Sequence, residues 1–201
     1  MSSVVFVISA PSGAGKTSLV AAVLSGDPKL AVSISHTTRA PREGEVHGKN
    51  YYFVSEAEFE GLVAQNKFSE YAKVFNNWYG TSLDSVEAIL AAGKDVILEI
   101  DWQGFEHVKT QFETVSVFIL PPSKQALRAR LAYRAKDKPE IIEARIQAAN
   151  NEVKHYTQYD YLLVNDDFNQ TVQDLQAIFR AERLKKGPQA QKLGDILAQF
   201  T

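Results

Sequence analysis

An apolar run passes directly into a glycine-rich loop near the start of this chain, and no other part of the sequence restricts the possible folds as strongly. Residues 4–8 (Val-Val-Phe-Val-Ile) have the length and the β-branched content of a buried strand. Residues 10–17 follow as Ala-Pro-Ser-Gly-Ala-Gly-Lys-Thr, and residues 16–24 have a helical pattern. This order of strand, loop and helix is the context that the Walker A pattern requires. We therefore expect residues 10–17, called the P-loop below, to bind the phosphates of a nucleoside triphosphate.

The P-loop can bind phosphate because its backbone N–H groups turn inward and the following helix presents its positive end. Lys16 can reach the β and γ phosphates, and the Thr17 hydroxyl can hold the Mg²⁺ ion that accompanies ATP. Ala10 stands where the pattern has its first glycine, and it fits if its φ angle is negative. The residues expected around the triphosphate are Ser12, Gly13, Ala14, Gly15, Lys16, Thr17 and Ser18.

Three further apolar runs of strand length lie at residues 96–100, 115–120 and 161–164. Near-continuous apolar runs are typical of strands that are buried on both faces of a parallel sheet. Stretches with a helical pattern alternate with them, at residues 85–92, 123–135, 139–156 and 172–184. This alternation predicts an α/β fold with a central parallel sheet flanked by helices.

Two stretches interrupt the alternation, so we expect a single domain with two insertions. Residues 35–82 are polar and carry tyrosines and glycines in short segments, and we interpret them as an inserted subdomain. Residues 126–151 carry a cluster of arginines on two short helices, and we interpret them as a helical insertion. The core would then consist of residues 1–34, 83–125 and 152–201. A chain of 201 residues is long enough to bury such a core.

The composition excludes several classes of function. The formal net charge is −2, whereas binders of nucleic acids and membrane surfaces usually carry a basic excess, so we expect neither partner. The chain has no cysteine, which rules out disulfides and thiolate metal ligands. No apolar run approaches the roughly 20 residues of a membrane-spanning helix, and the first residues do not resemble a signal peptide. We therefore expect a cytoplasmic protein, and the sequence indicates no particular oligomeric state.

Three charged residues outside the P-loop stand where a ligand could bind. Asp101 follows the run at residues 96–100, and the carboxyl end of a core strand lies at the ligand edge of an α/β sheet. Asp101 could contact a substrate or the surroundings of a magnesium ion, or it could cap the helix that follows. Arg39 and Arg42 could bind phosphate through their planar guanidinium groups, or they could lie in a solvated loop. The residues alone leave both alternatives open.

Several segments together resemble the guanylate kinase family. Besides the P-loop they are residues 35–53, 68–72 (Phe-Ser-Glu-Tyr-Ala), 78–81 (Trp-Tyr-Gly-Thr), 99–104 (Glu-Ile-Asp-Trp-Gln-Gly), 118–123 (Phe-Ile-Leu-Pro-Pro-Ser) and 161–166 (Tyr-Leu-Leu-Val-Asn-Asp). The resemblance covers nearly the whole chain, in order. It implies a P-loop kinase fold and ATP-dependent phosphorylation of GMP to GDP, with Mg²⁺ bound together with ATP.

The resemblance also implies that the inserted subdomain binds GMP. The residues that would hold the GMP phosphate are Arg39, Arg42, Tyr51 and Tyr79. The residues that would recognise guanine are Ser35, Glu70, Thr81 and Asp101. Guanine presents its N1–H and 2-amino donors on one edge, and a carboxylate such as that of Glu70 can accept both. Adenine has an acceptor at N1 and would leave such a carboxylate without its partners.

The helical insertion would act as a lid over ATP. In the family, arginines that match Arg130, Arg134 and Arg145 stabilise charge on the transferring phosphoryl group, although such a helix face can also be merely solvated, as we expect for Arg128. Asn165 matches a position near the adenine. Glycines often flank the second lid arginine in the family, and here Tyr133 and Ala135 replace them. The catalytic residues expected from motif and resemblance together are Lys16, Arg39, Arg42, Arg130, Arg134 and Arg145.

Two other functions fit parts of the sequence. A related P-loop kinase could act on another nucleotide or on a phosphorylated sugar, but it would have little reason to carry the four guanine-recognising residues together. A guanylate-kinase-like module could bind a phosphorylated peptide without catalysis. Such modules typically have a damaged P-loop, whereas Gly15, Lys16 and Thr17 are intact here. For the enzyme we expect direct in-line transfer, with no phosphoenzyme and no dedicated general base.

Overall fold

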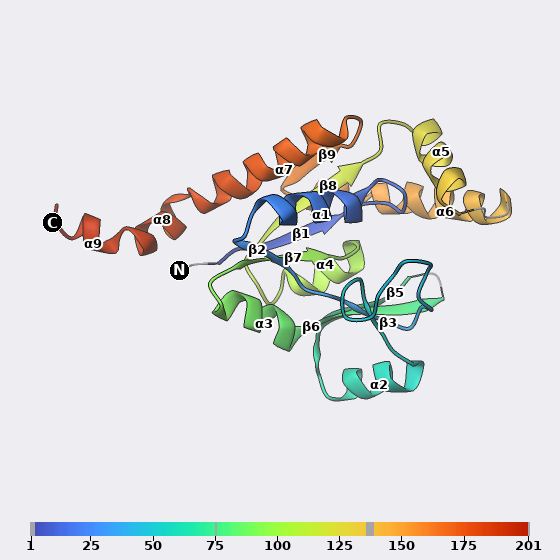
Figure 1. Cartoon of the computed structure of the whole chain (residues 1–201), viewed down its shortest axis with the longest axis horizontal. Helices are drawn as coiled ribbons and strands as arrows, with labels where there is room; N and C mark the ends of the chain where they lie inside the picture. The colour runs from blue at the N-terminus through green and yellow to red at the C-terminus, as the bar shows by residue number, and fades with distance from the viewer. Residues whose placement is uncertain (1–2, 75, 136–138, 201) are drawn as a thin grey trace.

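The computed structural model of the chain describes residues 3–74, 76–135 and 139–200, and of residues 134, 135 and 139–141 it describes the backbone alone. In this part of the chain the strands form two sheets. The larger sheet lies at the centre of the molecule, and helices cover both of its faces (Figure 1). The expected α/β fold with a central parallel sheet flanked by helices is therefore confirmed.

The central sheet contains all four apolar runs that were expected to form strands. In spatial order its strands are β2 (Leu30–Val32), β7 (Asp95–Glu99), β1 (Val5–Ser9), β8 (Thr114–Leu120) and β9 (Tyr161–Val164). Every adjacent pair is parallel. Strand β1 is buried along its whole length, because strands flank it on both sides and helices cover both faces of the sheet there. Strand β2 was not expected, and its three residues at the edge of the sheet are too short to give a clear sequence signal.

Side chains of β1 alternate between the two faces of the sheet and so divide the core into two layers. On one face they pack against α1 (Lys16–Gly26) and α7 (Phe168–Arg183). On the other face they pack against α3 (Leu83–Ala91) and α4 (Trp102–Val108). The strand that leads into the P-loop is thus fixed on every side, which gives the loop a rigid base.

The second sheet lies within the inserted subdomain. In spatial order its strands are β4 (Tyr52–Phe53), β3 (His36–Thr37), β6 (Asn77–Ser82) and β5 (Phe68–Val74). Strand β6 pairs antiparallel with both β3 and β5. Helix α2 (Glu56–Ala64) begins at a capping box that Ser55 and Glu58 form, and it packs on this sheet through Phe59.

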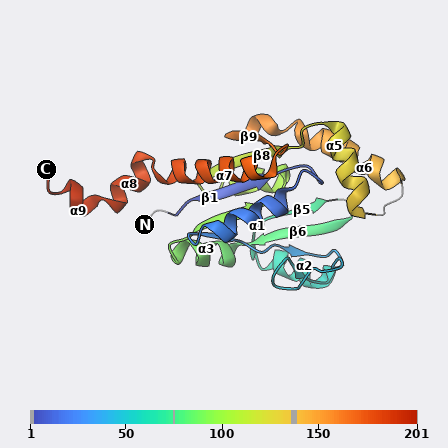
Figure 2. The ribbon, with the colours of Figure 1, turned by 45° about the horizontal axis from the view of Figure 1, so that its top comes forward.

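Helices α5 (Lys124–Ala135) and α6 (Pro139–Val153) pack on each other through Leu127, Leu131 and Ile146. Helix α6 ends three residues earlier than expected, and a short 3-10 turn, Tyr156–Gln158, follows it. These helices and the inserted subdomain lie at the same end of the central sheet, the end toward which β1 runs (Figure 1, Figure 2).

The chain ends in two short helices, α8 (Lys186–Lys192) and α9 (Gly194–Leu197), which extend from the body at the opposite end (Figure 2). Among the described residues, no helix combines the length and the apolar character that crossing a membrane requires.

Candidate active site

A cavity of about 610 Å³ lies between the P-loop and the inserted subdomain. It lies at the carboxyl ends of β1 and β7, the edge where open α/β sheets bind their ligands. The expected site residues that line it are Ser12, Gly13, Gly15, Lys16, Thr17, Ser35, Arg39, Arg42, Tyr51, Glu70, Tyr79, Asp101 and Arg145. The fold therefore brings the P-loop and most of the expected acceptor residues to one cavity.

The backbone conformation of the P-loop depends on two of its glycines. Gly13 and Gly15 have φ angles of 94° and 98°, in the left-handed region that favours glycine. Ala10 does not have a positive φ, which meets the condition for replacing the first glycine of the pattern. Helix α1 begins at Lys16, so its N-terminus adds a positive partial charge at the end of the loop.

Asn165, which was expected near the adenine, contacts the P-loop backbone. Its Nδ2 donates to the Ala14 carbonyl oxygen at 2.7 Å, and the residue is only 5% exposed. Arg130 Nη2 donates to the carbonyl oxygen of Asn165 at 2.8 Å, and its Nη1 donates to that of Ala14 at 3.5 Å. Neither Asn165 nor Arg130 lines the cavity. Their hydrogen bonds hold the backbone of the loop at Ala14 in this conformation.

Lys16 and Thr17 point toward the carboxyl end of β7. Lys16 Nζ donates to the Ile100 carbonyl oxygen at 3.5 Å, and the Thr17 hydroxyl donates to Glu99 Oε2 at 3.2 Å. A hydroxyl and a carboxylate are oxygen donors of the kind that Mg²⁺ prefers, and kinases bind the ion through one or two protein groups together with phosphate oxygens and water. This pair therefore fits a magnesium ion. Glu99 was not expected as a site residue, although it lies two residues before Asp101 in the same strand segment.

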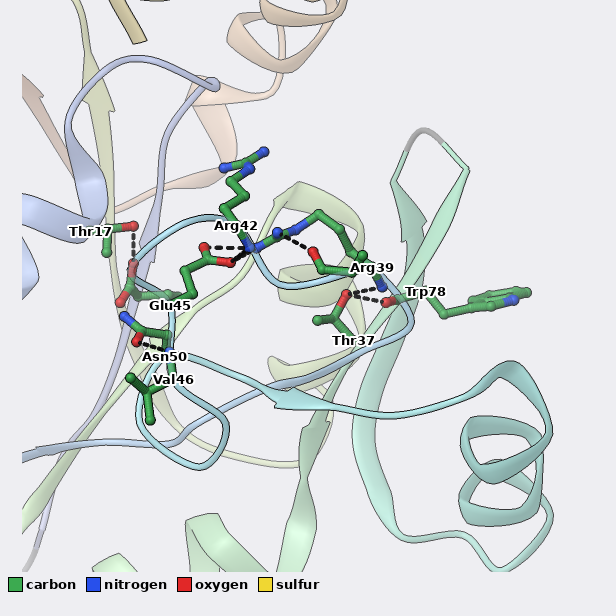
Figure 3. A network of polar contacts seen from close by, with 10 residues as sticks. Thr17, Thr37, Arg39, Arg42, Glu45, Val46, Asn50 and Trp78 are labelled. Carbon is green, nitrogen blue, oxygen red and sulfur yellow. Dashed lines mark hydrogen bonds and ion pairs between the residues drawn. The ribbon is translucent and has the colours of Figure 1, made fainter. Parts of the chain in front are cut away.

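Arg39 is paired within the inserted subdomain (Figure 3). Both oxygens of Glu45 accept from Arg39 Nη2 at 2.9 Å, and Oε2 also accepts from the backbone N–H of Arg42 at 2.8 Å. Burial opposes the charged form of Arg39, but the hydrogen bonds and the charge of Glu45 prevail and raise its pKa. Burial also opposes the charge of Glu45, but its contacts with Arg42 and Arg39 lower its pKa. The Glu45 carboxylate, which the sequence did not point to, thus orders the loop that carries both arginines.

Tyr51 and Tyr79 line the cavity beside Arg39. The two tyrosine rings meet edge to face with their centroids 5.9 Å apart, and the Arg39 guanidinium lies 5.4 Å from the Tyr51 centroid. Burial, assisted by the charge of Glu99, raises the pKa of Tyr51 to about 12. The Tyr51 hydroxyl therefore stays protonated at neutral pH and can donate a hydrogen bond to an anion.

Glu70 is a buried carboxylate, 6% exposed, that forms part of the cavity wall. Burial raises its pKa to about 7, although a hydrogen bond from the Thr81 hydroxyl to Glu70 Oε1, 2.5 Å long, opposes the change. Thr81 is fully buried and does not line the cavity. The structure thus places Thr81 as a support for Glu70, while Ser35 lines the cavity directly.

Asp101 lines the cavity and also caps a helix. Its Oδ1 accepts from the backbone N–H of Gly104 at 2.9 Å, and its Oδ2 accepts from Gln103 Nε2 at 3.2 Å. These contacts fix the first turn of α4. The two alternatives considered for Asp101 from the sequence are therefore compatible, because the capping carboxylate also faces the cavity.

The helical insertion contributes Arg145 to the cavity lining, whereas the side chain of Arg134 lies outside the described residues. Arg128 forms an ion pair with Glu143 and is more than half exposed, which agrees with the solvated role expected for it. Glu152, near the end of α6, also lines the cavity, and burial raises its pKa to about 7. No motif in the sequence identified Glu152, because only the fold brings it near the P-loop.

The inserted subdomain adds three lining residues that were not expected from the sequence. Ala72 and Val74 of β5 and Asn77 of β6 belong to the wall that the inserted subdomain forms. Of the expected site residues whose side chains are described, five do not line the cavity: Ala14, Ser18, Thr81, Arg130 and Asn165. Four of the five are close to it in the fold, since Ala14, Arg130 and Asn165 contact one another and Thr81 contacts Glu70.

Known proteins resemble the chain along almost its whole length. The family model described as guanylate kinase matches residues 2–182. The guanylate kinase of Methylococcus capsulatus is 54% identical over 196 residues, which are 97% of this chain and 96% of that protein. The guanylate kinase of Alkalilimnicola ehrlichii is 53% identical over 198 residues, which are 98% of each protein. A crystal structure of guanylate kinase from Anaplasma phagocytophilum has a TM-score of 0.78 at 35% identity and covers 92% of this chain and 88% of its own. The chain therefore belongs to the guanylate kinase family.

Proposed function

We infer that the chain transfers the γ-phosphoryl group of ATP to GMP, which yields ADP and GDP. The observation that carries this inference is the single cavity that joins the P-loop to Arg39, Tyr51 and Glu70. A loop suited to a triphosphate thus faces groups suited to a monophosphate and to a guanine edge. Membership of the guanylate kinase family supports the same reaction. Because ATP and GMP are cytoplasmic nucleotides, we propose that the reaction takes place in the cytoplasm.

The donor half of the site would bind ATP through the P-loop. Backbone N–H groups between Ser12 and Ser18 would contact the β and γ phosphates together with the ammonium group of Lys16. The Ala14 N–H is not one of them, because it donates to the Pro11 carbonyl oxygen at 3.0 Å. The Thr17 hydroxyl, with Glu99 beside it, would hold the Mg²⁺ ion, which neutralises charge on the phosphate oxygens when it is bound. Asn165 would keep the loop in its binding conformation through Ala14.

The acceptor half would bind the phosphate of GMP through two guanidinium groups and two hydroxyls. Arg39 and Arg42 can form charge-assisted hydrogen bonds with phosphate oxygens, and Tyr51 and Tyr79 can donate from their hydroxyls. Glu45 would keep the loop in place while Arg39 shares its donors between this carboxylate and the phosphate. The two guanidinium groups thereby neutralise charge on the GMP phosphate, which must approach the negatively charged γ-phosphate of ATP.

Guanine recognition would depend on Glu70. Its carboxylate can accept from N1–H and from the 2-amino group, and Thr81 would orient it through the bond that already exists. Ser35 can donate to O6 or N7 of the base, and Asp101 completes this end of the cavity. Adenine would leave buried polar groups without partners, which costs more than the loss of an exposed hydrogen bond.

The transfer itself would be an in-line displacement, in which a GMP phosphate oxygen attacks the γ-phosphorus and ADP leaves. A phosphate monoester oxygen is already anionic near pH 7, so no general base is needed. We propose that the helical insertion closes as a lid and brings Arg130, Arg134 and Arg145 to the transferring group. Arg130 would then exchange its carbonyl partners for phosphate oxygens. Closure would also exclude water, which prevents simple hydrolysis of ATP.

The direct test is a panel of acceptors. The purified protein is mixed with ATP and Mg²⁺ and, separately, with GMP, AMP, CMP or UMP, and ADP formation is followed. We expect turnover with GMP and little with the others, and none with GMP when Mg²⁺ is omitted. Equal turnover across the panel would contradict the guanine site, and no turnover with any acceptor would contradict the proposed reaction.

A further inference from the structure

Gly104, in the first turn of α4, lies against the carboxylate of Glu70. A Cβ atom built on Gly104 would be 2.6 Å from Glu70 Oε2, 3.0 Å from Glu70 Cδ and 3.2 Å from the Cβ atom of Ile100. Real Cβ atoms essentially never approach another heavy atom within 3.0 Å. Gly104 has a helical backbone without a positive φ angle, so its conformation alone does not require glycine. What requires glycine here is the space that the carboxylate occupies.

Helix α4 cannot easily retreat from this contact. Asp101 fixes its first turn by accepting from the N–H of Gly104 at 2.9 Å. Phe105 and Val108 are buried in the core beneath the central sheet. Just beyond the helix, Gln111 Nε2 donates to the Ser69 carbonyl oxygen at 2.5 Å, and this oxygen belongs to the residue next to Glu70. The helix and strand β5 are therefore held at a fixed separation on both sides of the contact.

The Glu70 side chain has little freedom in the other directions. Thr81 holds its Oε1, and the residue is 6% exposed. The remaining open direction leads into the cavity, whose wall Glu70 helps to form. A methyl group at position 104 would therefore displace the carboxylate into the space expected for the guanine edge.

We propose that Gly104 is a specificity-determining position, because the absence of a side chain lets the Glu70 carboxylate lie against α4 where it can accept both donors of guanine. This inference rests on the proposed function, since it assumes that Glu70 reads the base. Gly104 does not line the cavity. It acts only by setting the position of Glu70, and is thus a positioning residue.

The test compares Gly104→Ala with Gly61→Ala. Gly61 is also a helical glycine, in α2, but a Cβ atom there would meet nothing within 4 Å. For Gly104→Ala we expect the KM for GMP to rise about tenfold to a hundredfold, as for the loss of a hydrogen bond to a charged group, with the KM for ATP unchanged. The preference for GMP over inosine monophosphate, which lacks the 2-amino group, should shrink. Gly61→Ala should leave all these constants unchanged, and an unchanged KM for GMP in Gly104→Ala would overturn the proposal.

A double-variant cycle separates an effect through Glu70 from a general distortion. In a Glu70→Ala background, adding Gly104→Ala should change the KM for GMP by less than about twofold, because the displaced group is gone. An equal rise in both backgrounds would overturn the proposal. If Glu70→Ala alone left the KM for GMP unchanged, the proposed role of Glu70 would fail, and this inference with it. Turnover of GMP by the unaltered protein would still support the proposed reaction in that case. No turnover of GMP by the unaltered protein would refute the reaction itself.

A third variant covers the case in which Gly104→Ala folds poorly. Adding Glu70→Asp shortens the acidic side chain by one methylene and removes the close contact. We expect the double variant to have a higher melting temperature than Gly104→Ala alone. A melting temperature that stays as low as that of the single variant would show that Glu70 is not the group that excludes a side chain at position 104, and would overturn the proposal.

Discussion

The two halves of the cavity are built in different ways. The donor half is one continuous loop of eight residues, and two left-handed glycines give its backbone the conformation that binds phosphate. The acceptor half consists of side chains from β5, β6, the residue before β3, the loop before β4 and the segment before α4. Three of its charged groups, those of Arg39, Glu70 and Asp101, already have hydrogen-bond partners in the protein. Arg39 is paired with Glu45, and Glu70 accepts from Thr81. A site made of backbone is complete once the chain has folded, whereas a site made of side chains must share or exchange its partners when a ligand arrives.

Removal of the Lys16 ammonium group should have the largest effect, because it takes away the one side-chain cation that the donor half places in the loop itself. We expect Lys16→Ala to lower kcat by about 10³-fold or more, as for the loss of a preorganised charge at a developing anion. The melting temperature should change little, since the hydrogen bond of Lys16 to the Ile100 carbonyl oxygen is long, at 3.5 Å. Lys109→Ala, which removes an exposed lysine paired with Glu106, is the matched control. Unchanged turnover in Lys16→Ala would contradict the P-loop assignment.

Glu70 gives the acceptor half a pH dependence. Burial raises the pKa of Glu70 from 4.5 to about 7. Between pH 4.5 and pH 7 the Glu70 carboxyl group is therefore protonated in the folded protein but ionised in the unfolded chain. This group therefore makes the protein less stable as pH rises from 4.5 to 7, and it becomes able to accept both guanine donors only as pH rises through 7.

The kinetic measurement is kcat/KM for GMP between pH 6 and 8.5. We expect a rise centred near pH 7 in the unaltered protein. Glu70→Gln should lose this rise and increase the KM for GMP by about tenfold to a hundredfold. The second ionisation of a phosphate monoester, near pH 6, remains in both proteins and provides the internal control. A variant that keeps the rise near pH 7 would show that another group titrates there.

Glu45→Gln should have the smallest effect and tests whether the partner of Arg39 assists or competes with the substrate. Since Glu45 also accepts from the backbone N–H of Arg42, we expect its main role to be ordering of the loop. The KM for GMP should then rise by about threefold to tenfold, the size of one partly buried ion pair, while kcat and the KM for ATP stay unchanged. A lower KM would show instead that the carboxylate competes with the GMP phosphate.

Local patterns in the sequence predicted the donor half and the central sheet. The apolar runs of β1, β7 and β8 are continuous because these strands are buried on both faces. The run of β9 was expected to be buried in the same way, but β9 lies at the edge of the sheet and leaves Leu162 and Val164 exposed. The P-loop is a single segment, and two of its glycines have the positive φ angles that favour glycine. The short edge strand β2 escaped prediction, because three residues carry too little pattern to be told from a loop. Resemblance to a family, more than local pattern, predicted the acceptor residues.

Contacts between distant segments explain what could not be predicted. Thr81 could be expected to face the base, and only the pairing of β5 with β6 shows that its hydroxyl reaches Glu70. Asn165 could be expected beside the adenine, but its amide reaches Ala14 across 151 positions of sequence. Glu152 and Gly104 carry no motif of their own, and their importance depends on what the fold places against them.

The position of β1 has a consequence for how the protein is made. A ribosome releases the P-loop before the neighbours of β1 in the sheet, which are β7 and β8, from residues 95–120. The amide that holds Ala14 arrives later still, with Asn165. Such pairing of distant segments slows folding and delays it until synthesis is well advanced. The P-loop is thus synthesised well before the segments that hold it in place, and we expect nucleotide binding by a growing chain to begin only after residue 165 has left the ribosome.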